Sequence, residues 1–200
     1  MELVYVDGYK IRQNLDPDFT IIHFRNPDPT VFDSRWYIPE GEIWFDHFFK
    51  GEEDFLKEIL LSGLTDREEI KKHFCKKGKP GNFIVREEIK NSLKIQHVDG
   101  KTVREYIDPE FVFGGHDLVY SYVPEKTVWI DNRMDPRDIP HTLLHELTER
   151  KIMADEKKSY DVAHDYATAA EKESRRLAGG AYIGDANRSG KFSTNDFYIK

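Results

Sequence analysis

The sequence predicts an α+β protein made of two tandem duplicated copies, residues 1–88 and 89–200, each with two β-hairpins followed by helices. Two observations predict this fold. A pattern in the first half of the chain recurs in the second half. In both halves, runs rich in β-branched and aromatic residues precede stretches with helical periodicity. With 200 residues, of which 38% are hydrophobic, the chain can bury the core of one compact domain or two small ones.

Two pairs of segments carry the repeat. Residues 6–19 read VDGYKIRQNLDPDF and residues 98–111 read VDGKTVREYIDPEF, at an offset of 92. Residues 37–46 read YIPEGEIWFD and residues 122–131 read YVPEKTVWID, at an offset of 85. Two echoes in the same order at similar offsets indicate an internal duplication.

Each copy is expected to begin with two hairpins. Asp-Gly, at residues 7–8 and 99–100, is typical of a tight hairpin turn because it tolerates positive φ angles. A later Asp-Pro is expected to end the strand in both copies. The aromatic and β-branched runs on either side of Pro-Glu, at residues 39–40 and 124–125, predict the second hairpin.

Helices are expected to follow the hairpins. The helical stretches are residues 52–61, 66–77, 140–153 and 160–178. Asp138 and Pro140 are typical of a helix start, since a carboxylate caps free amides and proline lacks the donor that would go unused there. Gly179 and Gly180 end the last helix. The remaining tail is rich in Gly, Ser and Asn, and we expect an irregular segment that lies back on the body.

Composition narrows the class of function. The net charge of -7 and the pI of about 5.6 argue against nucleic acid as a partner, because such binding draws on clustered Lys and Arg. Cys75 is the single cysteine, which excludes an internal disulfide and a thiolate metal cluster. No secretory signal opens the chain and no run of about 18 apolar residues occurs in it. We expect a soluble cytoplasmic protein that binds no membrane.

A stripe of polar side chains marks the third predicted helix. His141, His145 and Glu149 recur every four residues, so on a helix they share one face. At the offset of 85 the first copy has Leu56, Leu60 and Leu64. Buried His and Glu side chains are costly unless something satisfies them. A bound metal ion would explain the replacement of three leucines.

The ligand types favour zinc. Catalytic zinc commonly takes two His and one carboxylate and leaves a fourth position for water. His145 and Glu149 lie one turn apart, and His164 on the next helix would be the third ligand. Alanines around His164 would let the two helices approach closely, although an ordinary Ala-rich packing surface is the alternative. Glu146 would stand beside the metal as the general base.

The segment HELTE, residues 145–149, resembles the HExxH helix of zincin metallopeptidases, particularly the gluzincins, in which a Glu from a following helix completes the site. Here Glu149 stands in place of the second His, and His164 stands in place of the downstream Glu. The resemblance implies that these two residues and His145 hold one zinc ion, with Glu146 as the base. It implies a zinc metallopeptidase-like hydrolase that acts on a peptide or protein substrate.

Other residues near the stripe have open roles. His141 could support the ligands, face solvent, or replace Glu149 as a ligand. His116 could polarise a substrate carbonyl or be an ordinary turn histidine. Tyr160 could stabilise an oxyanion or pack in the core, and Glu171 could orient a ligand or be a solvated helix residue. The strand at residues 127–130 is a candidate edge for an extended substrate.

Two other functions use the same residues. A carboxylate-rich di-iron site would draw on a wider set of side chains. That set is His141, His145, Glu146, Glu149, His164 and Glu171. A non-enzymatic binding or assembly module would use the metal ion only to stabilise the fold of the second copy. Metal content separates the first alternative from the zinc hydrolase, and substitution of Glu146 separates the second.

Overall fold

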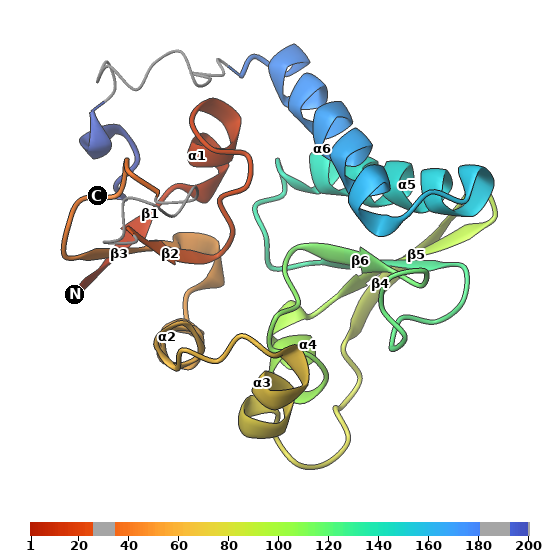
Figure 1. Cartoon of the computed structure of the whole chain (residues 1–200), viewed down its shortest axis with the longest axis horizontal. Coiled ribbons are helices and arrows are strands. Elements are labelled where there is room, and N and C mark those ends of the chain that lie inside the picture. The colour runs from red at the N-terminus through yellow and green to blue at the C-terminus, as the bar shows by residue number, and fades with distance from the viewer. Residues whose placement is uncertain (26–34, 181–192, 200) are drawn as a thin grey trace. The chain divides into compact units, whose positions relative to one another are not determined.

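The computed structural model describes residues 1–25, 35–180 and 193–199, and confirms an α+β fold (Figure 1). The chain forms two compact units. The first unit is Met1–Leu61 with Gly179–Lys200, and the second unit is Ser62–Ala178. These units are defined by the contacts between residues. The copies 1–88 and 89–200 were defined by the sequence repeat, and that division stays a prediction.

The first unit contains a three-stranded mixed sheet in the order β1-β3-β2. β1 (Glu2–Val6) is parallel to β3 (Glu42–Asp46), and β2 (Ile22–Phe24) is antiparallel to β3. α1 (Gly8–Asn14) follows β1, and α2 (Glu53–Leu61) follows a 3-10 turn after β3. The core of this unit contains Val6, Ile11, Phe19, Tyr37, Ile38, Trp44 and Phe197.

The second unit contains a four-stranded mixed sheet in the order β4-β5-β7-β6. Its strands are β4 (Ile84–Lys90), β5 (Leu93–Val98), β6 (Gly114–His116) and β7 (Thr127–Asp131). β5 and β7 are parallel, and the other two pairs are antiparallel. The helices of this unit are α3 (Arg67–Phe74), α4 (Gly100–Tyr106), α5 (Ile139–Glu156) and α6 (Tyr160–Leu177).

The segments that echo each other in sequence occupy equivalent places. In each unit a strand leads directly into a short helix, then into a short antiparallel strand, and then into a central strand parallel to the first. β1-α1-β2-β3 therefore corresponds to β5-α4-β6-β7. The equivalence supports the duplication inferred from the sequence. Among the described residues, β4 has no counterpart in the first sheet, and it was not predicted.

The hairpin predicted at each Asp-Gly is wrong. Asp7 instead caps α1, where its carboxylate accepts a hydrogen bond from the amide of Lys10 at 3.0 Å. Asp99 holds the same position before α4. Because a helix follows, the strand before it pairs in parallel with a distant strand rather than with its neighbour. Asp-Pro lies in the loop after α1 and in the loop after α4, so it follows a helix and does not end a strand.

The second predicted hairpin is wrong as well. Only the residues after Pro-Glu form strands, β3 and β7, while Tyr37 and Tyr122 lie in turns. The amides of Ile38 and Val123 donate to carbonyl groups three residues earlier, which forms a turn instead of a ladder. β7 lies between β5 and β6, so it offers no free edge to an extended substrate. The edges of this sheet are β4 and β6.

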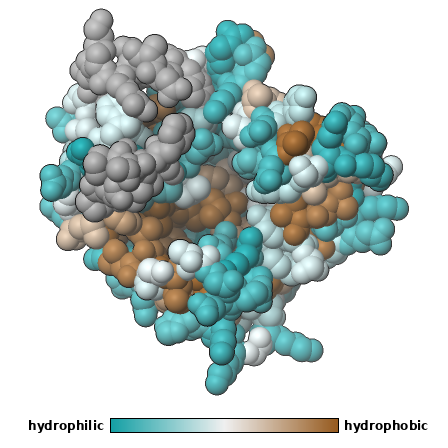
Figure 2. All heavy atoms as spheres, viewed as in Figure 1, coloured by the Kyte–Doolittle hydropathy of each residue, from teal (hydrophilic) through white to brown (hydrophobic). Residues whose placement is uncertain are grey.

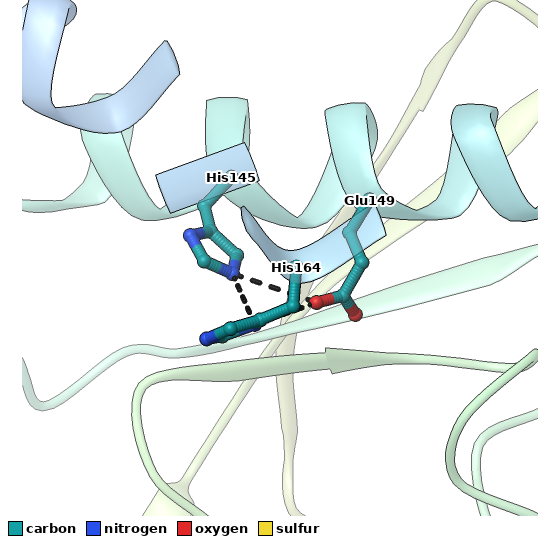
Figure 3. Close-up of side chains that lie close together, drawn as sticks. All are labelled: His145, Glu149 and His164. Carbon is teal, nitrogen blue, oxygen red and sulfur yellow. Dashed lines mark hydrogen bonds and ion pairs between the residues drawn. The ribbon is translucent and has the colours of Figure 1, made fainter. Parts of the chain in front are cut away.

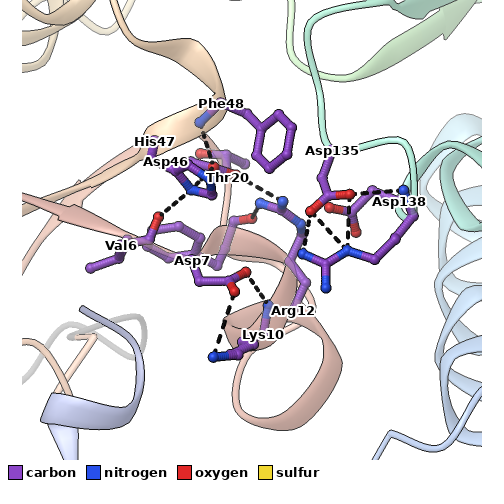
Figure 4. A network of polar contacts seen from close by, with 12 residues as sticks. Val6, Asp7, Lys10, Arg12, Thr20, Asp46, His47, Phe48, Asp135 and Asp138 are labelled. Carbon is purple, nitrogen blue, oxygen red and sulfur yellow. Dashed lines mark hydrogen bonds and ion pairs between the residues drawn. The ribbon is translucent and has the colours of Figure 1, made fainter. Parts of the chain in front are cut away.

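A buried ion pair occupies the equivalent place in each unit. Arg12 Nη2 lies 2.8 Å from Asp46 Oδ2 in the first unit (Figure 4). Arg104 Nη1 lies 2.7 Å from Asp131 Oδ2 in the second unit. All four side chains are at most 1% exposed. Each arginine also donates to a backbone carbonyl seven residues later, so each guanidinium ties its short helix to the central strand.

The glycine of each Asp-Gly is needed for these ion pairs. A Cβ atom on Gly8 would lie 2.0 Å from Asp46 Oδ2, and one on Gly100 would lie 1.9 Å from Asp131 Oδ2. No real Cβ atom approaches a carboxylate so closely. The repeated glycine therefore makes room for the aspartate, and its freedom at positive φ is not what the fold uses.

The predicted helices are confirmed within a few residues at each end. α2 ends at Leu61, so Leu64 lies outside the helix and the comparison with Glu149 fails there. Gly179 follows the last helix with φ of 92°. At the end of the tail, Tyr198 bridges to Val6, so this part packs on the first unit as expected. Residues 181–192 of the tail lie outside the described part.

The surface is mainly polar. Hydrophilic side chains are spread over the face shown in Figure 2, with hydrophobic areas between them, and 34% of all residues in the chain are charged. In the described part of the chain, every helix is too short or too polar to cross a membrane.

Candidate metal centre

Two helices of the second unit, α5 and α6, carry the candidate site and lie side by side (Figure 1). α5 begins after Asp138 with a proline in its first turn, and Lys157 ends it in the left-handed conformation. Ser159 precedes α6, so the connection is short and the helices form an antiparallel pair. Ala163 and Ala167 of α6 are fully buried, and such short side chains allow close helix packing.

Three side chains from this pair converge (Figure 3). His145 and Glu149 come from α5, and His164 comes from α6. His145 Nε2 lies 3.2 Å from His164 Nδ1, and His164 Nδ1 lies 2.8 Å from Glu149 Oε2. The third side of the triangle, from His145 Nε2 to Glu149 Oε2, is 3.7 Å. The structure thus brings together the three ligands expected from the sequence, in a group that could hold a metal ion.

The spacing of the three atoms suits a small metal ion. Zinc bonds of 2.0–2.1 Å place neighbouring atoms of a tetrahedral ligand set about 3.3 Å apart. The three observed distances lie on both sides of this value. The His164 side chain is 42% exposed, whereas that of Glu149 is only 5% exposed. The group therefore has a buried side and a side open to solvent, where a fourth ligand could enter.

Glu171 orients His145. Its Oε2 atom lies 3.0 Å from His145 Nδ1, and because a carboxylate only accepts, Nδ1 carries a proton. The other ring nitrogen, Nε2, faces the ligand group. Burial alone would lower the pKa of His145, but contacts with Glu149 and Glu171 raise it to about 10. Without metal the Nε2 proton balances the buried carboxylates, and a metal ion would take its place.

A buried chain of charges supports Glu171 in turn. Arg175 donates to Glu171 Oε1 at 3.0 Å from Nε and at 2.8 Å from Nη2. Its Nη1 atom donates to Asp138 Oδ1 at 2.7 Å. Arg175 and Asp138 are at most 1% exposed. Since Arg175 occupies Oε1 of Glu171, Oε2 remains for His145.

Glu149 is shared in the same way. Its Oε1 atom lies 2.9 Å from His116 Nε2, while Oε2 faces His164. The amide of Leu118 donates to His116 Nδ1 at 3.3 Å, so in the neutral ring the proton lies on Nε2 and is donated to Glu149. Burial would raise the pKa of Glu149, but contacts with its histidine partners hold it well below the ordinary value. Glu149 is thus a carboxylate with one oxygen already oriented and one oxygen aimed at the ligand group.

Glu146 lies beside this group and packs on β6. A Cβ atom on Gly114 would lie 2.8 Å from Glu146 Oε1, so glycine makes room for the carboxyl group. Within the described residues no hydrogen bond reaches the Glu146 carboxyl. Burial raises its pKa to about 8, against the opposing charge of His145. A nearby divalent cation would favour the carboxylate form, which leaves Glu146 able to accept a proton.

A second group of three ligand-type residues is His116, Glu146 and Glu149. It shares Glu149 with the first group. A metal on His116 Nε2 would need a proton on Nδ1, where the Leu118 amide already donates. The hydrogen bonding therefore favours one ion, held by His145, Glu149 and His164, with His116 as an orienting residue.

Tyr160 and His141, which the sequence also indicated, lie next to the ligand group but outside it. Tyr160 stacks on His164 with ring centroids 5.4 Å apart, and burial raises the pKa of Tyr160 to about 12. Its hydroxyl group thus keeps its proton at neutral pH. His141 Nδ1 lies 2.8 Å from Ser174 Oγ, outside both ligand groups. Burial and the charge of Arg175 lower the pKa of His141.

Sequence reasoning missed several residues that shape this site. Arg175 could have been found, because it stands one helical turn after Glu171. Gly114 had only a weak signal, as one of two adjacent glycines. The amide of Leu118 and the pairing of Asp138 with α6 have no signal in the sequence.

Comparisons with protein-family models, with curated proteins and with solved structures found no match to this chain. The structure shows a group of three side chains that could hold a metal ion, and the resemblance to the gluzincins is confined to the sequence of residues 145–149. Any function has to be argued from the chemistry of these side chains.

Proposed function

We propose that this protein is a metal-dependent hydrolase with one zinc ion held by His145, Glu149 and His164. The observation that carries the proposal is the convergence of these three ligand atoms next to a carboxyl group, Glu146, that has no hydrogen-bond partner in the described part of the chain. Two His and one carboxylate are a common ligand set of catalytic zinc. The substrate class we propose is a peptide or other amide.

The metal would polarise the substrate carbonyl and lower the pKa of a water molecule toward about 7. Glu146 accepts a proton from the attacking water as its oxygen adds to the carbonyl carbon. The same proton passes from Glu146 to the leaving nitrogen, and the C–N bond breaks. The Tyr160 hydroxyl, which stays protonated, donates a hydrogen bond to the oxygen that gains negative charge.

The supporting residues fit this chemistry. Glu171 keeps the proton of His145 on Nδ1, and His116 fixes one oxygen of Glu149. Such outer contacts orient metal ligands and tune their basicity. The open side of the group, next to the exposed part of His164, gives a substrate access.

Metal content and turnover test the proposal together. Purified protein should contain one zinc per chain by elemental analysis, and His164→Ala should lose it. His73→Ala, on the exposed face of α3, should keep it. Glu146→Gln should keep the metal and lose cleavage of a mixed peptide library followed by mass spectrometry, whereas Glu173→Gln should retain cleavage. Full cleavage by Glu146→Gln, or no metal in the wild type, would overturn the proposal.

A di-metal carboxylate site is the second candidate. The sharing of Glu149 between two ligand groups favours it, because one carboxylate can bridge two ions. It requires two metal ions per chain, with iron as the alternative metal. Elemental analysis of the wild type distinguishes the two candidates directly.

A further inference from the structure

β4 is an exposed edge strand of the second sheet. It pairs with β5 on one side, and no strand of the described chain pairs with its other side. All seven of its residues are exposed, including Val85 at 55% and Ile89 at 69%. Unpaired amide and carbonyl groups on such an edge can extend a sheet into another chain.

The charges on β4 decide whether a second copy could pair there. The strand reads IVREEIK, and charged side chains usually protect an edge against pairing. Two copies related by a two-fold axis perpendicular to the sheet would form an antiparallel pair of β4 strands. Residues that lie opposite each other in this pair must have their side chains on the same face of the sheet. This condition is met only where the two-fold axis passes through a residue of β4. The strand therefore offers only a few possible registers.

A register centred on Glu87 is complementary. It places Arg86 opposite the partner's Glu88, and Val85 opposite the partner's Ile89, each twice by symmetry. Opposite charges and apolar pairs across strands are both stabilising. Centring on Arg86 would put two arginines face to face. Centring on Glu88 would face two glutamates and set Arg86 against the partner's Lys90. Centring on Ile89 would pair Glu88 with the partner's Lys90, but only residues 88–90 of the strand would overlap.

One like-charge contact remains in the favoured register, between the two copies of Glu87. This carboxylate is already held on its own sheet, with Gln96 Nε2 at 2.8 Å and Lys94 Nζ at 3.5 Å. Gln96 and Lys94 both lie on β5, so they hold the Glu87 carboxylate on the side of the strand away from the two-fold axis. A β-bulge lies between Ile84 and Arg86. The pairs of Arg86, Glu87 and Glu88 about the axis therefore fall on the regular part of the strand, whereas the contact of Val85 with the partner's Ile89 falls at the bulge.

We propose that β4 is a self-association surface, on which a second copy of this chain adds β4 in antiparallel register centred on Glu87. The contact covers seven residues of one edge, which is small for a protein interface. The dimer is therefore weak and forms in a concentration-dependent way. The inference is independent of the metal site.

Charge reversal tests the register. Sedimentation velocity from about 10 µM to 1 mM should show the wild type moving toward dimer, with Kd in the range of weak transient pairs. Arg86→Glu and Glu88→Arg should each stay monomeric, since each sets like charges opposite one another. An equimolar mixture of the two variants should dimerise, and so should the double variant Arg86→Glu/Glu88→Arg. A monomeric wild type, or a dimer that both single variants retain, would overturn the proposal.

Cross-linking provides a second readout. In a Cys75→Ser background, Glu87→Cys places a thiol next to its own copy across the axis and should form a disulfide-linked dimer under mild oxidation. Lys90→Cys in the same background should not, because its counterpart lies six residues away along the partner strand. Equal cross-linking of both variants would show that the register is wrong.

Discussion

Glu149 links β6 to α6: one carboxylate oxygen lies 2.9 Å from His116 Nε2 and the other lies 2.8 Å from His164 Nδ1. The first contact is buried and fixes the carboxylate. The second belongs to the candidate ligand group. His116 thus orients Glu149, whereas His164 would share a metal ion with it, and this difference predicts the effects of substitutions at the site.

His116→Ala removes the donor that fixes Glu149. We expect metal affinity to fall about 10- to 100-fold, the range found when outer contacts of a metal site are lost. Competition with a chromogenic chelator measures this change. His73→Ala, which lies on the exposed face of α3, serves as the control and should bind metal as the wild type does. Wild-type affinity in His116→Ala would contradict the orienting role.

Arg175→Met removes the guanidinium group that pairs with both Asp138 and Glu171. Breaking a buried ion pair from one side costs on the order of 3–5 kcal/mol, so urea unfolding of the metal-free protein should shift by that amount. Metal affinity should fall as well, because Glu171 then loses its fixed orientation toward His145. Arg176→Met changes an exposed arginine paired with Glu173 and should alter neither quantity measurably.

Gly114→Ala would displace Glu146, whose carboxyl oxygen lies 2.8 Å from the added Cβ atom. We expect turnover to drop on the order of 100-fold, as for a misplaced catalytic group, while the zinc content stays at one per chain. Gly81→Ala is the matched control, because no atom lies within 4 Å of its added Cβ. Loss of zinc in Gly114→Ala would mean that β6 supports the ligands rather than the base.

The repeated ion pairs should matter equally in both units. Arg12→Met and Arg104→Met each remove the cation of a buried ion pair and should each destabilise the protein by about 3–5 kcal/mol in urea unfolding. Replacing both members of one pair, as in Arg104→Met/Asp131→Asn, should cost less, since no unpaired charge remains and the Asn oxygen can still accept from the amides of Gly100 and Arg133. A double variant that is less stable than Arg104→Met would contradict this expectation.

Acid should weaken the first unit through His23. The amide of Thr20 donates to His23 Nε2 at 2.9 Å, and burial together with the charge of Arg35 lowers the pKa of His23 to about 3. The unfolded chain binds this proton near pH 6.5, so between these values unfolding takes up protons. Stability is complete above pH 6.5 and falls below it by up to about 1.4 kcal/mol per pH unit. His23→Gln should flatten this part of the stability curve measured by urea unfolding from pH 7.5 to 4.5.

The sequence by itself determined the elements whose signal is local. Helical periodicity placed α5 and α6, and a spacing of four residues put His145 and Glu149 on one face. His164 was proposed as the third ligand because the alanines around it would let the two helices approach closely. The two echoes identified equivalent segments, and the structure places them at equivalent positions in the two sheets.

Only the tertiary structure decided which strands pair and which distant residues orient the candidate ligands. Asp-Gly fits both a hairpin turn and a helix cap, and the parallel pairing of β1 with β3 selects the cap. His116 reaches Glu149 across 33 residues, and Asp138 reaches Arg175 across 37. Such contacts depend on how whole elements pack, because no local spacing encodes them. The candidate ligands and Glu171 were therefore predictable from one helix pair, whereas the contacts of His116 and Asp138 became visible only when the sheet and helices were assembled.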